Sequence, residues 1–162
     1  MQYTFFNTFR PLKWFSFSCV LLLFVAVFNS SAVSEEGFVI VVNADNTYNS
    51  KEKSVLRKLR SLYLLSSSSW PNKSPSEPIG RGPAHPAQII FQEKVLRMND
   101  KRLEQHWERQ KSRNKTPPAA IVHPRSLLQK VAMNKGAFGI MSKSELRKLP
   151  ANVRILISYV PN

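Results

Sequence analysis

The segment GFVIVVNAD, residues 37–45, sets the fold class expected for this chain. It is a continuous apolar run, rich in β-branched residues, that ends in the turn-forming sequence Asn43-Ala44-Asp45-Asn46. A strand without polar alternation is typically buried on both faces, as in parallel or mixed sheets that carry helices on each side. The segment therefore predicts an α/β fold in which Gly37–Asn43 is a fully buried strand.

Two polar side chains, Asn43 and Asp45, stand at the carboxyl end of that predicted strand. In open α/β sheets, ligands bind at the carboxyl ends of strands, so both residues are candidate ligand contacts. Asn and Asp also hydrogen-bond their own backbone in turns, and this alternative remains open.

Upstream of the strand, the first 32 residues have the layout of a secretory signal peptide. Arg10 and Lys13 form a short basic region, an apolar run extends from Trp14 to Phe28, and small residues precede a cleavage site after Ala32. The run is shorter than the roughly 20 apolar residues of a membrane span, although an uncleaved N-terminal anchor is an alternative. We therefore expect a signal peptide over 1–32, a folded domain over 33–162 and a periplasmic location.

The composition of the expected domain limits its chemistry and its partners. The one cysteine, Cys19, lies in the apolar run, so the domain has to be held together by packing alone. The formal charge of +14 falls to +12 when Arg10 and Lys13 are removed, which favours an anionic partner. No basic-aromatic stacking motif accompanies the charge, and exported proteins rarely meet nucleic acid, so we expect no nucleic-acid site.

Downstream, periodicity and turn residues predict alternating helices and strands. Asn49 and Glu52 have the spacing of a capping box ahead of an amphipathic helix with a basic outer face. A serine-rich loop then follows. The remaining expected elements are helices over Pro86–Met98, from Asn99-Asp100 onward and over Arg125–Asn134, strands over Ala119–Val122, Gly136–Met141 and Val153–Val160, and a short helix or turn over Ser144–Leu149.

The stretch PIGRGPAHPAQIIFQEKVLRM, residues 78–98, is a candidate anion site. Arg81 stands in a glycine-containing turn that leads into the helix expected from Pro86. Such a turn presents backbone N–H groups and the positive end of a helix dipole, which suit an anion. An ordinary junction between a loop and a helix is the alternative.

Other catalytic and cofactor motifs are not found in the sequence. His85, His106 and His123 are far apart, with no cysteine or repeated carboxylate at ligand spacing, so no metal site is expected. No nucleophile elbow, carboxylate pair or phosphate-binding Gly-x-x-x-x-Gly-Lys loop is present. We therefore expect no cofactor and no enzymatic activity.

Several short motifs occur in one order along the chain. They are FVIVVNADN, SWPN, a turn with Arg81 ahead of a helix containing Phe91, then His106-Trp107, Pro117-Pro118 and NKGAFGIM. In this order they resemble the phosphate-binding-protein-like family, the exported substrate-binding proteins of ABC transporters. The resemblance implies a type II periplasmic-binding-protein-like fold, of which this chain matches a single lobe, a mixed sheet with flanking helices.

The resemblance also implies a ligand and a set of contacts. In the family, the loop before the Phe91 helix typically reads Arg-x-x-Gly-Ser-Gly-Thr. Here Arg81 and Gly82 remain, but prolines, Ala84 and His85 replace the hydroxyl residues, and each proline removes a backbone N–H. We therefore expect weak or lost binding of inorganic phosphate or another small oxyanion. The tentative ligand-binding residues are Arg81, Gly82, Ala84, His85, Asn43 and Asp45.

Two kinds of partner are compatible with these features. The resemblance implies an ABC transporter for phosphate uptake. Alternatively, the chain is an exported adaptor that keeps the fold and uses its basic surface to bind an acidic protein partner, with no small ligand. Contact with the membrane is expected only through an uncleaved signal, if at all.

Overall fold

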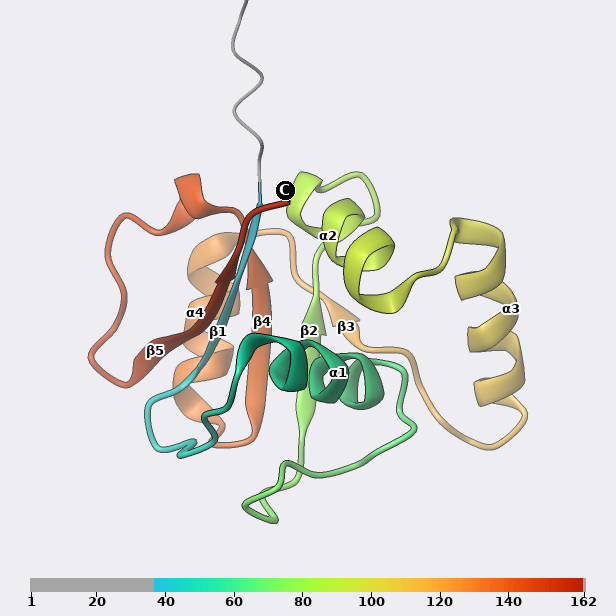
Figure 1. Ribbon diagram of the computed structural model, residues 1–162, viewed down its shortest axis with the longest axis horizontal. Coiled ribbons are helices and arrows are strands. Elements are labelled where there is room, and N and C mark those ends of the chain that lie inside the picture. Colours follow the sequence, from blue (N-terminus) through green and yellow to red (C-terminus); the bar gives the residue numbers. More distant parts are fainter. Residues whose placement is uncertain (1–36, 162) are drawn as a thin grey trace, which may run out of the picture. The chain divides into compact units, whose positions relative to one another are not determined.

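The structure is a computed structural model that describes residues 37–161. The signal peptide expected over 1–32 and its boundary with the folded domain lie outside the described residues. The described residues form one five-stranded mixed sheet with helices on both faces (Figure 1). The expected α/β fold class is therefore confirmed.

The sheet has the strand order β3-β2-β4-β1-β5. Strand β2 runs parallel to both β3 and β4, whereas β1 runs antiparallel to both β4 and β5. This difference in direction decides which loops meet at each end of the sheet. The strands are β1 Phe38–Asn43, β2 Glu77–Gly80, β3 Ala119–Ala120, β4 Ala137–Met141 and β5 Val153–Tyr159.

The helices divide between the two faces. On one face α1, α2 and the π-helical turn η1 that continues α2 pack against the sheet, and α3 lies outside them; α4 covers the other face. The helices are α1 Glu52–Tyr63, α2 Pro86–Phe91, η1 Gln92–Leu96, α3 Asp100–Lys111, α4 Pro124–Met133 and the short 3-10 helix η2 Lys143–Glu145.

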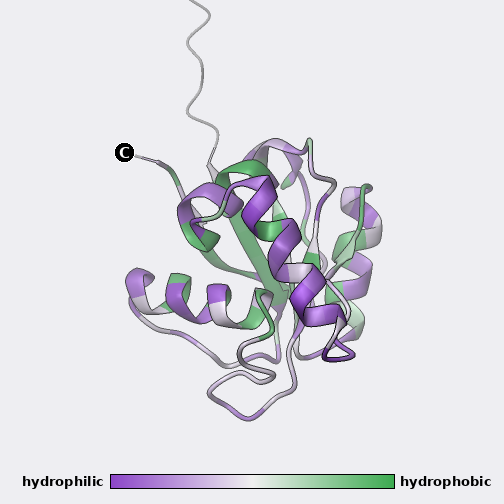
Figure 2. Ribbon diagram, turned by 90° about the vertical axis from the view of Figure 1, so that its right-hand side faces the viewer, coloured by the Kyte–Doolittle hydropathy of each residue, from purple (hydrophilic) through white to green (hydrophobic). Residues whose placement is uncertain are grey.

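Strand β1 supplies both halves of the core, as its apolar run predicted. Phe38, Ile40 and Val42 point toward α1 and α2, while Val39 and Val41 point toward α4. All six residues of the strand are buried. In Figure 2 the strands at the centre are green, and the helices around them alternate between green and purple turns. Burial of apolar surface on both faces of one strand therefore holds the helices to the sheet.

Several local expectations were wrong. Helix α1 begins at Glu52 after Lys51 without a side-chain cap, so Asn49 does not cap it. The segment Ala119–Val122 was expected to be a buried strand, but β3 is two residues long and exposed at the sheet edge. Strand β2 was not expected, because Pro78 cannot donate to a sheet and favours a loop reading.

The helix expected over Pro86–Met98 ends early. It closes in the π-helical turn η1, and Arg97 then adopts a left-handed conformation with φ of 53°. The next helix follows as expected, with the Asn99 side chain accepting a hydrogen bond from the Arg102 N–H at 3.0 Å. No helix within residues 37–161 combines the length and the apolar character needed to cross a membrane.

Candidate functional site

Arg81 lies at the carboxyl end of β2, next to the carboxyl end of its parallel neighbour β4. Its backbone N–H donates to Gln88 Oε1 at 2.9 Å, and Gln88 Nε2 donates to the Tyr63 hydroxyl at 3.1 Å. These two bonds tie the turn to both α2 and α1. Gly80 leaves space for them, since a Cβ there would lie 2.6 Å from the Tyr63 hydroxyl oxygen.

Tyr63 supports this arrangement as a neutral acceptor. Burial raises the pKa of the Tyr63 phenol to about 12, and its hydrogen bond with Gln88 opposes part of that rise. The hydroxyl therefore stays protonated over the physiological pH range. A stable network thus fixes the backbone of Arg81.

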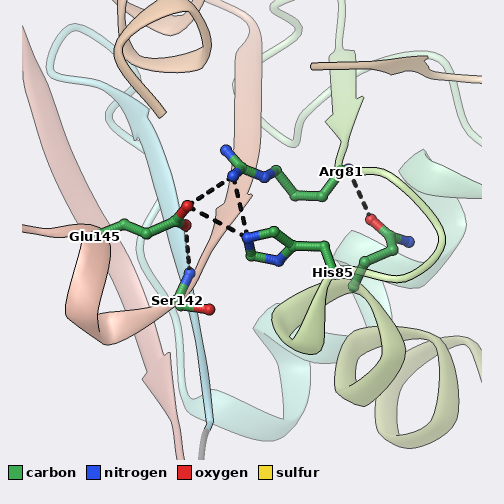
Figure 3. Close-up of polar contacts among 5 residues, drawn as sticks. Arg81, His85, Ser142 and Glu145 are labelled. Carbon is green, nitrogen blue, oxygen red and sulfur yellow. Dashed lines mark hydrogen bonds and ion pairs between the residues drawn. The ribbon is translucent and has the colours of Figure 1, made fainter. Parts of the chain in front are cut away.

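The Arg81 guanidinium contacts an acid from a distant part of the chain. Its Nη2 atom donates to Glu145 Oε1 at 2.6 Å, and the Arg81 side chain is only 2% exposed (Figure 3). The second oxygen of Glu145 accepts from the Ser142 backbone N–H at 2.9 Å, as part of a capping box at η2. Charge-assisted bonds of this kind are roughly twice as strong as neutral ones.

His85 completes the group. Its Nε2 atom lies 3.0 Å from Arg81 Nη2 and 3.3 Å from Glu145 Oε1 (Figure 3). Because a guanidinium can only donate, the 3.0 Å contact is a hydrogen bond only in the tautomer that carries its proton on Nδ1, and in that tautomer Nε2 and Glu145 Oε1 are both acceptors and do not bond to each other. Arg81, His85 and Glu145 form what we call the Arg81 cluster.

The Arg81 cluster contains unused hydrogen-bond donors. Arg81 Nε and Nη1 and His85 Nδ1 are buried and have no hydrogen-bond partner among the described residues. A buried donor without an acceptor costs about 1–3 kcal/mol, and more when it is charged. A planar guanidinium with free donors matches the geometry of a carboxylate or phosphate. These donors would suit a further oxyanion, but they are buried, so such an anion would have to open the cluster and compete with Glu145 to reach them.

Only two of the four predicted turn residues belong to the Arg81 cluster. Arg81 and His85 meet in the cluster, whereas Ala84 is exposed on the turn. The Gly82 carbonyl accepts the His85 N–H at 2.9 Å, which closes the turn. Helix α2 begins at Pro86, which has no N–H to offer an anion. Most of the donors that remain therefore belong to side chains and not to the helix start.

Asn43 and Asp45 were named with Arg81 as tentative ligand-binding residues, but the structure does not place them beside Arg81. Val39 pairs with Met141 and Val42 with Phe138, so β1 runs antiparallel to β4. The carboxyl end of β1 therefore lies at the opposite end of the strands from Arg81. There Asn43 Nδ2 donates to the carbonyls of Val131 and Ala132 in α4, and Asn43 Oδ1 accepts the Asp45 N–H. The bond between the Asp45 N–H and Asn43 is the turn chemistry that the sequence left open, whereas the bonds from Asn43 to the end of α4 were not expected.

Sequence reasoning missed Glu145 and Gln88 as members of the site. A signal for Glu145 was present, because Ser142 and Glu145 have capping-box spacing directly after the glycine-punctuated strand. Nothing in that spacing relates Glu145 to Arg81. Within residues 37–161, no three His, Cys, Asp or Glu side chains are grouped so as to hold a metal ion.

Comparison with protein-family models gave no match, and comparison with curated proteins gave none either. The fold is nevertheless similar to solved structures. One is an ABC-type phosphate transport receptor from Vibrio cholerae, with a TM-score of 0.53 and 14% identity over 75% of this chain and 45% of that chain. Another, from Clostridium perfringens, is assigned to the phosphate ABC transporter substrate-binding proteins and has phosphate bound, with a TM-score of 0.53, 14% identity and coverage of 75% and 44%.

A third is described as a possible phosphate-binding protein from Planctomyces limnophilus, with a TM-score of 0.53, 18% identity and coverage of 75% and 40%. This chain therefore spans less than half the length of the solved structures it matches. The five-stranded mixed sheet and its flanking helices have the fold of part of a phosphate-binding protein of the ABC-transporter type.

Proposed function

We propose that this protein is an exported, non-catalytic solute-binding domain in which the Arg81 cluster binds phosphate or a similar small oxyanion weakly. The observation that carries the proposal is the buried Arg81 guanidinium, whose Nε and Nη1 atoms have no partner among the described residues. The similarity of the fold to phosphate-binding proteins, one of them solved with phosphate, supports the choice of ligand.

Weak binding follows from the composition of the cluster. Glu145 already neutralises Arg81 at 2.6 Å and is held there by the Ser142 N–H. An incoming anion has to displace or approach this tethered carboxylate, and like charges repel at short range. The prolines at 83 and 86 also remove N–H donors from the turn.

Thermal unfolding in matched ionic strength tests this proposal. A ligand that binds only the folded state stabilises it by about 2.7 kcal/mol at a hundredfold excess over Kd. We expect phosphate to raise the melting temperature more than chloride does, and only at high phosphate concentration. Equal shifts with every anion would contradict a phosphate site and would indicate screening of the basic surface. Micromolar binding of phosphate in calorimetry would contradict the weakened site.

In this proposal the protein is located in the periplasm and serves phosphate uptake beside an ABC transporter. The signal-like sequence of the first 32 residues and the fold likeness support that placement. Detection of the protein in the osmotic-shock fraction, with Ala32 as the last residue removed, is the expected result. Retention in the cytoplasm would contradict it.

A second candidate function is that of an adaptor for an acidic protein. It rests on a basic hollow of about 320 Å³ between α1 and η1, where side chains of Lys53, Arg57, Arg60 and Arg97 surround Leu56 and Val95. Reversal of Arg57 and Arg60 to Glu would abolish capture of such a partner and leave any phosphate response unchanged. That separation distinguishes the two functions.

A further inference from the structure

A second hollow of about 700 Å³ lies between α4 and the segment Glu145–Pro150, which links η2 to β5. We call it the α4 groove. In Figure 1 the orange segment after η2 descends beside α4. Its volume falls within the roughly 300–1,000 Å³ of small-molecule sites. None of the phosphate-related features described above uses this space, apart from the Glu145 side chain that borders both.

The α4 groove has an apolar wall. Leu128 and Ala132 of α4 face Leu149 and Pro150 of the linking segment. Leu128 is 8% exposed and belongs to the core cluster beneath α4, which makes this wall part of a rigid packed layer. Apolar surface of this kind gains free energy when a ligand removes it from water.

The rim of the α4 groove is basic. Arg125, Arg147 and Lys148 line it, are exposed, and make no ion pair with any described residue. The acid that lines it, Glu145, is already neutralised by Arg81. The groove therefore combines an apolar wall with a net positive rim, which selects for an anion over a neutral or cationic ligand.

The basic side chains and the apolar side chains lie in different parts of the α4 groove. Helix α4 follows the carboxyl end of β3 and η2 follows the carboxyl end of β4, and both strands run parallel to β2, so α4 and the linking segment start at the same end of the sheet. Asn152 Nδ2 donates to the Ala132 carbonyl at 2.9 Å near their other ends, so the two segments run in the same direction. Arg125 and Arg147 therefore belong to the early part of the groove, and Ala132 and Pro150 to the late part. From Arg125 to Ala132 the helix advances roughly 10 Å.

From this arrangement we propose that the α4 groove binds a small amphipathic carboxylate. The carboxylate pairs with Arg125 and Arg147, and an unbranched apolar chain lies along Leu128, Ala132 and Leu149. The site is distinct from the Arg81 cluster, since its cations are exposed arginines and its ligand needs an apolar body. It goes beyond the phosphate-binding function and does not depend on it.

Octanoate is the probe, because its extended chain is comparable in length to the groove. Calorimetric titration of the full chain is expected to show saturable binding of octanoate and none of acetate or octylamine at matched ionic strength. The double variant Arg125→Ala/Arg147→Ala is expected to bind octanoate at least about tenfold more weakly, the effect of losing one charge-assisted bond. Lys101→Ala, an exposed change on α3, is the matched control and is expected to leave binding unchanged.

A second variant tests the apolar wall. Ala132→Phe fills the late part of the α4 groove and is expected to abolish octanoate binding while thermal unfolding shows that the domain still folds. Inorganic phosphate is expected not to compete with octanoate, which keeps this site separable from the Arg81 cluster.

The proposal would be overturned if octanoate did not bind saturably, if octylamine bound equally well, or if phosphate displaced octanoate. Unchanged affinity in the double arginine variant or in Ala132→Phe would also overturn it, as would tighter arginine-dependent binding of an acidic leucine-rich peptide. The last result would assign the groove to a protein partner.

Discussion

Glu145 Oε1 lies 2.6 Å from Arg81 Nη2, although the two residues are 64 positions apart in the chain. The chain thus places one of its own carboxylates against the buried guanidinium that the sequence marked as an anion-binding group. Breaking a buried ion pair by removing one partner is costly, because it leaves the other charge uncompensated. Glu145 therefore both stabilises the fold and limits access of other anions to Arg81.

The substitution Glu145→Gln separates these two effects. It removes the charge but keeps the shape, so we expect a loss of about 1–3 kcal/mol in the free energy of unfolding, since the Glu145 side chain is 17% exposed. In the same variant, the stabilisation by phosphate relative to chloride is expected to increase. Chemical unfolding in phosphate and in chloride measures the free energy of unfolding and its dependence on the anion.

The control is Glu108→Gln, which removes an exposed ion pair with Lys111 and is expected to lower the free energy of unfolding by less than about 1 kcal/mol. An unchanged phosphate response in Glu145→Gln would show that the carboxylate does not compete.

Removal of the guanidinium tests the anion site itself. Arg81→Ala is expected to abolish the phosphate-specific rise in melting temperature, while Arg81→Lys keeps the charge but loses bidentate geometry and is expected to retain only part of it. The measurement is thermal unfolding over a phosphate series at constant ionic strength. Arg109→Ala, an exposed change on α3, is the control for general charge. If Arg81→Ala responds to phosphate as the native chain does, Arg81 is not the binding group.

The buried phenol of Tyr63 predicts a dependence of stability on alkaline pH. Its pKa of about 12 in the folded state lies above the ordinary tyrosine pKa of 10.0. The stabilising contribution is therefore complete below pH 10 and is lost as pH rises from 10 to 12, because the unfolded chain releases its proton first. The size is about 2–3 kcal/mol. Urea unfolding across this pH range gives the free energy of unfolding of the native chain and of Tyr63→Phe. The difference between the two free energies is expected to narrow as pH rises. Parallel pH profiles would contradict the burial-driven shift.

Asn43 is expected to act in stability and not in binding. Asn43→Ala removes two hydrogen bonds to α4 carbonyls and is expected to cost about 1–3 kcal/mol. Asn152→Ala removes an exposed bond to the same Ala132 carbonyl and is expected to cost less. Denaturant midpoints compare the two variants, and a phosphate series checks the ligand response. A phosphate response lost in Asn43→Ala at full stability would restore Asn43 to the binding site.

Sequence alone determined the local features of this protein. The unbroken apolar run of β1 fixed a strand buried on both faces, because only a covered sheet can bury every residue of a strand. The apolar periodicity of α4 and the capping side chain of Asn99 fixed two helices for similarly local reasons. The turn around Arg81 was also recognisable from its own residues.

Tertiary structure decided what lies beside that turn. Burial and periodicity are properties of one segment, but the direction of a strand depends on which neighbours it pairs with, and the apolar pattern of β1 is the same in either direction. Because β1 runs antiparallel to β4, Asn43 lies at the opposite end of the strands from Arg81. Because β2 and β4 run parallel, Arg81 and Glu145 lie at the same end, where the Glu145 carboxylate pairs with the Arg81 guanidinium.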